Sequence, residues 1–76
     1  MFIHTYETKN YGDDWHCAAF TIPKHYLEIQ KWCHETFGKP GYPQDVPQTR
    51  WRDDIYYGEI YFRDDRDLVL FMLRWA

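Results

Sequence analysis

The sequence predicts an α+β domain of two layers, in which two helices pack on one face of a small antiparallel sheet of three or four strands. Two segments near the N-terminus alternate along the chain, a central segment repeats apolar residues at helical spacing, and a final apolar stripe follows an acidic run. These observations give the order β-β-α-β-α. Because a chain of 76 residues buries only a small core, we expect residues 1–76 to form a single domain.

The first two strands are predicted from alternation on either side of a turn. Residues 2–8 place Phe2, His4 and Tyr6 on one face. Residues 9–14 are rich in Asn, Gly and Asp, which favour a turn, and residues 15–22 form the second strand. Two sets of side chains compete for the buried face of this second strand: Ala18, Phe20 and Ile22 against Trp15, Cys17 and Ala19.

The central helix is predicted to begin near Pro23, since a missing N–H costs nothing in the first helical turn. Gly38 is typical of the position just past a helix end, and Pro40 prevents continuation. Between them, apolar residues recur at spacings of three, four and four, which is the pattern of one helical face: Tyr26, Ile29, Cys33 and Phe37. Leu27 and Trp32 flank this stripe and widen the buried arc.

Residues 39–49 contain three prolines and are expected to form an extended loop, of a length that often serves function. A short strand at residues 50–52 follows. Residues 55–63 are then predicted to form one continuous strand. Its side chains divide between a face toward the helices, with Tyr56, Ile60 and Phe62, and a face away from them, with Tyr57, Glu59, Tyr61 and Arg63.

The C-terminal segment allows two interpretations. As a helix, Asp64 is the N-cap, acidic residues occupy the first turn, and an apolar stripe follows with Leu68, Phe71, Met72 and Trp75. As a strand, residues 68–75 would pair back on residues 55–63. We favour the helix, because the segment has one Val as its only β-branched residue, whereas its Leu and Met residues are better helix formers.

Composition narrows the class of protein. The net charge is -3, and positive and negative residues are interleaved, so the basic face typical of nucleic-acid binding is missing from the sequence. No apolar run approaches the length of a membrane span, and the first residues lack the pattern of a signal peptide. We therefore expect a soluble cytoplasmic protein with no membrane association, whose two cysteines are free thiols.

The residues that could carry chemistry are few. The chain has no serine, no phosphate-binding glycine loop and no zinc-protease motif, so we expect it not to be an enzyme and to use no cofactor. The neighbours His16–Cys17 and Cys33–His34 cannot all converge on one ion, because adjacent side chains diverge on strands and helices. A metal site built from Cys17, Cys33 and one of His4 or His25 stays open as an alternative, although we predict no metal.

The second half of the chain resembles small uncharacterised proteins encoded by tailed bacteriophages. The resemblance spans roughly residues 30–76 and rests on W-C-x-E-x-F-G at residues 32–38, on Arg50–Trp51, and on F-x-x-x-x-D-x-x-x-F-x-L-R-W at residues 62–75. Leu68 stands where that pattern often has Ala. These motifs are apolar anchors, so the resemblance implies a phage accessory protein in the host cytoplasm and transfers no catalytic residue. It also implies a helical C-terminal segment.

The function that we expect is binding to another protein. Exposed Tyr, Trp and Arg are common at the centres of protein interfaces. The residues predicted to contact the partner are Tyr57, Tyr61 and Arg63 on the open sheet face, with Tyr42, Arg50 and Trp51 in or beside the loop. A homodimer could bury the same face. The alternative is a binder of single-stranded nucleic acid that stacks bases on these aromatics, although the mixed charge makes nucleic acid an unfavoured partner.

Overall fold

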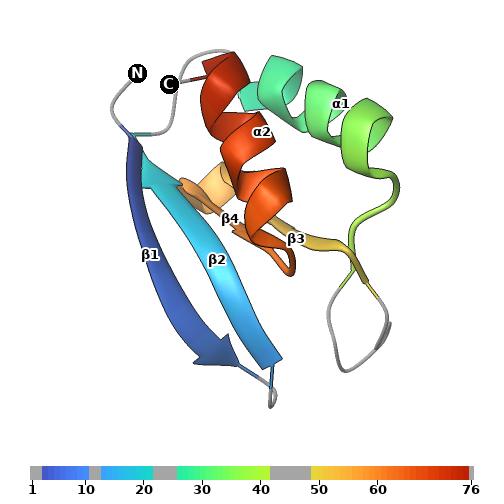
Figure 1. The fold of residues 1–76 in the computed structure, drawn as a ribbon. Helices are drawn as coiled ribbons and strands as arrows, with labels where there is room; N and C mark the ends of the chain where they lie inside the picture. The colour runs from blue at the N-terminus through green and yellow to red at the C-terminus, as the bar shows by residue number, and fades with distance from the viewer. Residues whose placement is uncertain (1–2, 11–12, 22–25, 42–48, 76) are drawn as a thin grey trace.

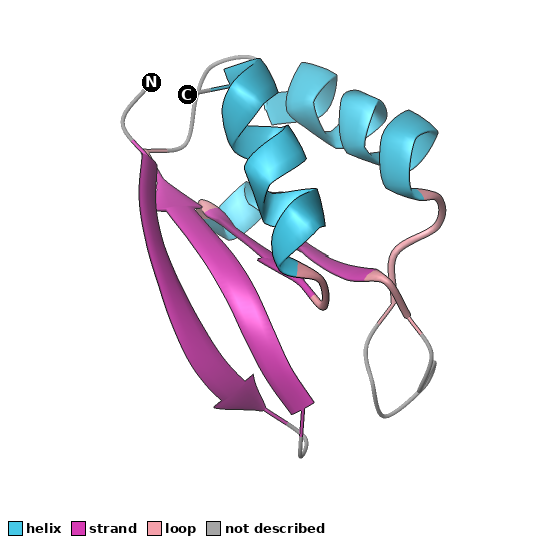
Figure 2. Cartoon of the chain, in the orientation of Figure 1, coloured by secondary structure: helices cyan, strands magenta, loops and turns pink. Residues whose placement is uncertain are grey.

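The computed structural model describes residues 3–10, 13–21, 26–41 and 49–75, and it confirms the predicted fold class (Figure 1). The elements are the strands β1 (Ile3–Asn10), β2 (Asp13–Phe20), β3 (Trp51–Asp54) and β4 (Glu59–Phe62) and the helices α1 (Tyr26–Phe37) and α2 (Asp65–Trp75). A short three-ten helix, η1 (Ile55–Tyr57), lies between β3 and β4. Both α-helices cover the same face of the sheet (Figure 2).

The four strands form one antiparallel sheet in the order β1-β2-β4-β3. The β1–β2 hairpin pairs over its whole length, from Ile3 opposite Phe20 to Asn10 opposite Asp13. In contrast, β2 pairs with β4 only over His16–Ala19. The end of the hairpin therefore extends beyond β4 as a two-stranded ribbon (Figure 1).

The core lies between the sheet and the two helices. From the sheet it takes Ala18, Phe20, Trp51, Ile60 and Phe62, and from the helices Ile29, Cys33, Phe37, Leu68 and Phe71. Ala18 and Phe20 therefore face the helices, which resolves the choice left open by the sequence. Trp15 and Cys17 are equally buried, at 1% and 0% exposed, although they point to the opposite face of the sheet.

Helix α1 follows the predicted stripe. Ile29, Cys33 and Phe37 are buried, and Tyr26 and Trp32 pack against the core as half-buried side chains. Leu27, predicted to widen the buried arc, is instead 62% exposed, because it lies to the side of the stripe that faces the sheet. At its end Gly38 adopts a φ of 85°, and its N–H donates to the carbonyl of His34 at 3.0 Å. This left-handed residue ends the helix where the sequence predicts. The predicted start at Pro23 lies outside the described residues.

The predicted strand over residues 55–63 is confirmed at Glu59–Phe62, with Ile60 and Phe62 facing the helices, but the prediction is wrong for residues 55–57. The chain instead turns through η1 and returns antiparallel to β3 as β4. The Asp53 carboxylate accepts the Ile55 N–H at 3.1 Å, and Gly58 donates to the Ile55 carbonyl at 2.9 Å with a φ of 79°. These local bonds outcompete the β-propensity of the run. Tyr56, predicted to face the helices, is 61% exposed as a result.

The helical interpretation of the C-terminal segment is confirmed by α2. The Asp64 carboxylate accepts the Arg66 N–H at 2.9 Å and so caps the first turn. Leu68 and Phe71 are buried, and Met72 and Trp75 pack against the core. Every helix in the described part of the chain is too short or too polar to span a lipid bilayer.

Candidate functional site

The outer face of α2 carries three exposed aliphatic side chains. Val69, Leu70 and Leu73 are 49%, 42% and 79% exposed, and they lie opposite the buried Leu68 and Phe71. Their spacing places them within one turn of each other on the helix surface. We call these three residues the α2 apolar face. An exposed apolar group of this kind in a small protein is typical of a contact surface.

A groove of about 1110 Å³ runs along the α2 apolar face and around the N-terminal end of the helix. Its remaining lining is mainly charged: His16 from β2, Thr49 and Arg50 before β3, Arg63 and Asp64 after β4, and Asp65, Arg66 and Asp67 of α2. Three arginines and three aspartates thus border it. The groove therefore joins an apolar side to a side of mixed charge.

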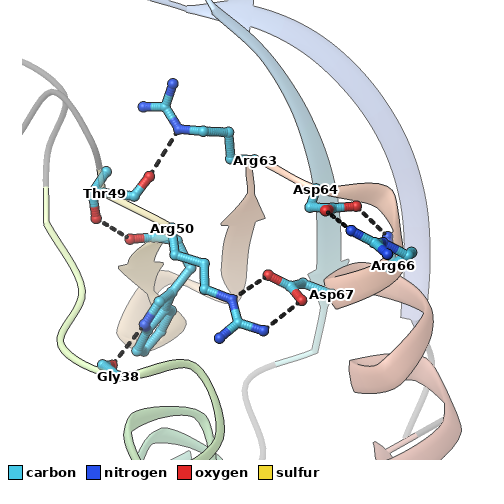
Figure 3. A network of polar contacts seen from close by, with 8 residues as sticks. Gly38, Thr49, Arg50, Arg63, Asp64, Arg66 and Asp67 are labelled. Carbon is cyan, nitrogen blue, oxygen red and sulfur yellow. Dashed lines mark hydrogen bonds and ion pairs between the residues drawn. The ribbon is translucent and has the colours of Figure 1, made fainter.

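Arg50 and Asp67 form an ion pair with two hydrogen bonds at the groove (Figure 3). Arg50 donates from Nε to Asp67 Oδ2 at 2.7 Å and from Nη2 to Oδ1 at 2.9 Å. This two-bond geometry raises the pKa of Arg50 above its ordinary value, chiefly through the hydrogen bonds to Asp67. The guanidinium also lies 5.2 Å from the ring centroid of Phe37. Arg50 is consequently held between the groove and the core.

The other two arginines are also fixed by neighbours (Figure 3). Arg63 donates from Nε to the Thr49 carbonyl at 2.8 Å, and its guanidinium lies 4.9 Å from the ring of Trp15. Arg66 donates to Asp64 at 3.1 Å, and this contact lowers the pKa of the Asp64 carboxyl. Since Arg66 is largely exposed, its bond to Asp64 contributes little to stability.

The sheet face that no described helix covers is occupied by a polar and aromatic network. The hydroxyls of Tyr6 and Tyr61 both donate to Glu59 Oε2, at 2.7 Å and 2.8 Å. Burial and the bond to Glu59 raise the pKa of both phenols. Arg52 covers the Tyr61 ring at 4.8 Å and pairs with Asp54 at 3.0 Å. We call Tyr6, Arg52, Asp54, Glu59 and Tyr61 the open-face network.

The six residues predicted to contact a partner do not form one site. Arg50 and Arg63 both line the groove, whereas Tyr61 belongs to the open-face network. Tyr57 lies in η1 and not on the sheet; it is 74% exposed and packs edge-on against Tyr56. Trp51 is 0% exposed, so its side chain offers no surface to a partner. Tyr42 lies outside the described residues.

Trp51 is buried because strand alternation turns its side chain toward the helices, while its neighbour Arg52 points away. Its indole N–H donates to the Gly38 carbonyl at 2.8 Å, and its ring packs against His34 and Phe37. The indole therefore ties β3 to the end of α1. Trp51 was predicted to contact a partner, but it faces the core because it pairs across the strands with the core residue Phe62.

The two cysteines are separated by the sheet. Cys33 lies on α1 within the core, whereas Cys17 lies between Tyr6 and Tyr61 in register on the opposite face. A metal site that uses both thiols therefore cannot form in this fold. Burial raises the pKa of Cys17 to about 11 and also raises the pKa of Cys33, which keeps both as unreactive thiols. Of the histidines proposed with them, His4 stacks on Tyr6, and His25 lies outside the described residues.

Within residues 3–10, 13–21, 26–41 and 49–75, no group of three or more His, Cys, Asp or Glu residues is placed to hold a metal ion. The α2 apolar face was not among the contact residues predicted from the sequence. The sequence does contain a signal for this face, because Val69, Leu70 and Leu73 fall outside the stripe of Leu68, Phe71, Met72 and Trp75.

Comparisons with protein-family models, curated proteins and solved structures found no match to this chain.

Proposed function

We propose that this chain is a non-enzymatic accessory protein that binds another protein through the groove and the α2 apolar face. One observation carries the proposal: three aliphatic side chains on one helix face border a groove that also presents fixed arginines. Consistent with the resemblance to tailed-phage proteins, we include a phage origin and a cytoplasmic site of action in this proposal.

The energetics of the groove suit a protein partner. Covering exposed aliphatic surface contributes roughly 25 cal/mol per Å² of apolar area removed from water. Arg50 and Arg63 are already held by Asp67 and by Thr49, so a partner that contacts them loses little further side-chain entropy. Arginine is one of the residue types enriched at interaction hot spots, which makes Arg50 and Arg63 the favoured polar contacts of a partner.

The alternative of single-stranded nucleic acid is less well supported. The Tyr61 ring is covered by Arg52, and the Trp15 ring is 1% exposed beneath Arg63, so these rings offer little surface for base stacking. Base-stacking grooves are also strongly positive. In the groove, by contrast, Arg50 and Arg66 are paired with Asp67 and Asp64.

The experiment places a photoactivatable amino acid at Leu73 of the full chain, expressed in its native host. Leu27 of α1, 62% exposed, is the matched control position. A discrete adduct from position 73 that is missing from position 27 would identify the partner. The purified partner should then bind the wild-type chain at least about tenfold more tightly than the Leu70→Asp variant, while Leu27→Asp binds like wild type. Equal binding by all three chains would refute the proposal.

A further inference from the structure

The two edges of the sheet differ in what covers them. At the β3 edge, the Trp51 carbonyl accepts the Gly41 N–H at 3.2 Å and the Thr49 hydroxyl at 3.0 Å. The Trp51 indole also donates to the Gly38 carbonyl. The other edge is β1, an eight-residue strand that pairs with β2 on one side, and no described strand pairs with its outer side. Unpaired edges of this length are usually protected or used in binding.

The register shows which residues of β1 turn their backbone groups outward. The Phe20 N–H donates to the Gly58 carbonyl next to β4, so Phe20 directs its polar groups away from β1. Ile3, its partner, therefore directs its own groups away from β2. By alternation the same holds for Thr5, Glu7 and Lys9. These four residues present N–H and C=O groups to a further strand.

The outer part of the hairpin is also thinly supported. β4 pairs with β2 only as far as His16, so Thr8–Asn10 and Asp13–Trp15 form a ribbon of two strands. In Figure 1 this end of the hairpin projects away from both α-helices. A ribbon of two strands is marginally stable in water, and a third strand beside it would contribute support.

The polar side chains of this ribbon form complementary cross-strand pairs. Lys9 lies 3.9 Å from Asp14, and Glu7 lies 3.3 Å from His16, with all four side chains on the helix-facing side of the hairpin. If two β1 strands pair antiparallel about Thr8, Glu7 of each copy faces Lys9 of the other. Four side chains then lie side by side across the joined sheets. Asp14 and Lys9 come from one copy, and Glu7 and His16 come from the other. Opposite charges that face each other across strands stabilise the pairing.

Other two-fold registers that keep the outward backbone groups paired are less favourable. Pairing about Glu7 would set the two Glu7 side chains opposite each other, which is repulsive. Pairing about Tyr6 would place Lys9 opposite Ile3 and Glu7 opposite Thr5, and both charges would lack an intermolecular partner. Pairing about Thr8 overlaps the two β1 strands over residues 6–10, so it covers the unsupported ribbon and sets Glu7 opposite Lys9, while Ile3 and Thr5 have no β1 residue opposite them.

We propose that two copies of this chain dimerise through β1, paired antiparallel about Thr8 to give a continuous eight-stranded sheet. The dimer is formed by the outer edge of β1 and not by the side chains of α2, so this inference does not rest on the proposed function, although His16 lines the groove and is also one of the four side chains that lie side by side in the dimer. The proposed dimer, which uses the β1 edge, also differs from the homodimer expected from the sequence, which would bury the open sheet face. That face is filled by the open-face network, whose polar groups already pair with one another.

A charge-exchange experiment on the full chain tests the dimer. Native mass spectrometry and sedimentation should show a dimer of the wild-type chain at about 100 µM. Lys9→Glu sets Glu7 against a glutamate and Glu7→Lys sets Lys9 against a lysine, so each variant alone should dimerise at least about tenfold more weakly. A 1:1 mixture of the two variants should restore a dimer with one copy of each. Circular dichroism confirms that each variant is folded.

Cysteine cross-linking fixes the register. At a non-hydrogen-bonded antiparallel pair the Cα atoms are about 4.5 Å apart, within reach of a disulfide. Thr8→Cys should therefore form an interchain disulfide on mild oxidation. Tyr6→Cys should not, and the wild-type chain is the background control because Cys17 and Cys33 are buried. A monomeric wild-type chain, a mixture that stays monomeric, or a disulfide from Tyr6→Cys in place of Thr8→Cys would each overturn the proposal. Leu73→Asp should dimerise like wild type, which separates this test from that of the groove.

Discussion

The two faces of the sheet exclude water by different means. The helix-side face does so with apolar side chains beneath α1 and α2, among them Phe20, Ile60 and Phe62. The opposite face has no described helix over it, yet Cys17 is 0% exposed and Trp15 1% exposed. There, rings, guanidinium groups and hydrogen bonds to Glu59 cover the strands. The free energy of unfolding should therefore depend on buried apolar volume at the helix-side face and on hydrogen bonds at the opposite face.

The largest effect is expected from the helix-side face. Phe71→Ala removes a fully buried ring that lies near Phe20, Trp32 and Phe62. We expect the free energy of unfolding to fall by about 3–5 kcal/mol, from lost burial and from the cavity left behind. Urea denaturation at neutral pH measures it. Leu73→Ala on the exposed side of the same helix should change stability by less than about 0.5 kcal/mol. Equal effects at the two positions would contradict this view of the core.

A smaller effect is expected from the open face. Glu59→Gln keeps the size of the side chain but replaces the carboxylate that accepts hydrogen bonds from Tyr6 and Tyr61. We expect a loss of about 1–3 kcal/mol, because bonds to a charged acceptor are stronger than bonds to a neutral one. A double-mutant cycle with Tyr6→Phe should show coupling between the two sites. Additive losses would mean that Glu59 and Tyr6 stabilise the fold independently.

The open face should also make stability sensitive to alkaline pH. Burial and the bond to Glu59 raise the pKa of Tyr6 and Tyr61 above the ordinary value of 10.0. Between the unfolded and folded pKa values the folded chain binds more protons than the unfolded chain. Their contribution is therefore complete below pH 10 and is lost as the pH rises through the raised values. The free energy of unfolding should fall above pH 10.

The control for this pH effect is a chain without the two half-buried phenols, those of Tyr6 and Tyr61. Tyr6→Phe combined with Tyr61→Phe should flatten the alkaline decline measured by urea denaturation. Cys17, whose pKa burial raises to about 11, should leave a smaller residual slope. Tyr57→Phe, on an exposed ring in η1, should leave the decline unchanged. An identical decline in all variants would remove Tyr6 and Tyr61 as its source.

Much of the fold was predictable from the sequence because its elements carry local signals. The cap at Asp64 and the stripe from Leu68 to Trp75 correctly favoured a helix over a strand. The continuous strand over residues 55–63 failed for a local reason that its composition hides. Its aromatic and β-branched residues favour a strand, but the hydrogen bond from the Ile55 N–H to Asp53 and the left-handed Gly58 turn the chain instead.

The candidate site was less predictable, because it depends on tertiary placement. Arg50 and Arg63 were singled out as exposed cations, but their shared groove exists only because α2 packs beside the start of β3. Trp51 was predicted to contact a partner because the prediction of a short strand at residues 50–52 did not include which of its side chains faces the core. The alternation of Arg50, Trp51 and Arg52 already suggested a tryptophan pointing inward between two outward arginines.

The strand order has a consequence for how the chain folds. Each half of the sheet is a local pair, because β1 and β2 are consecutive along the chain and β3 is joined to β4 through η1. Among the described strand pairs, the β2–β4 seam, His16–Ala19 against Glu59–Phe62, is the pair that joins residues distant in sequence. Closing that loop costs chain entropy before its contacts form, so the seam should set the folding rate. Substitutions at Ala18 or Ile60 should slow folding, whereas those at the end of the β1–β2 hairpin should mainly speed unfolding.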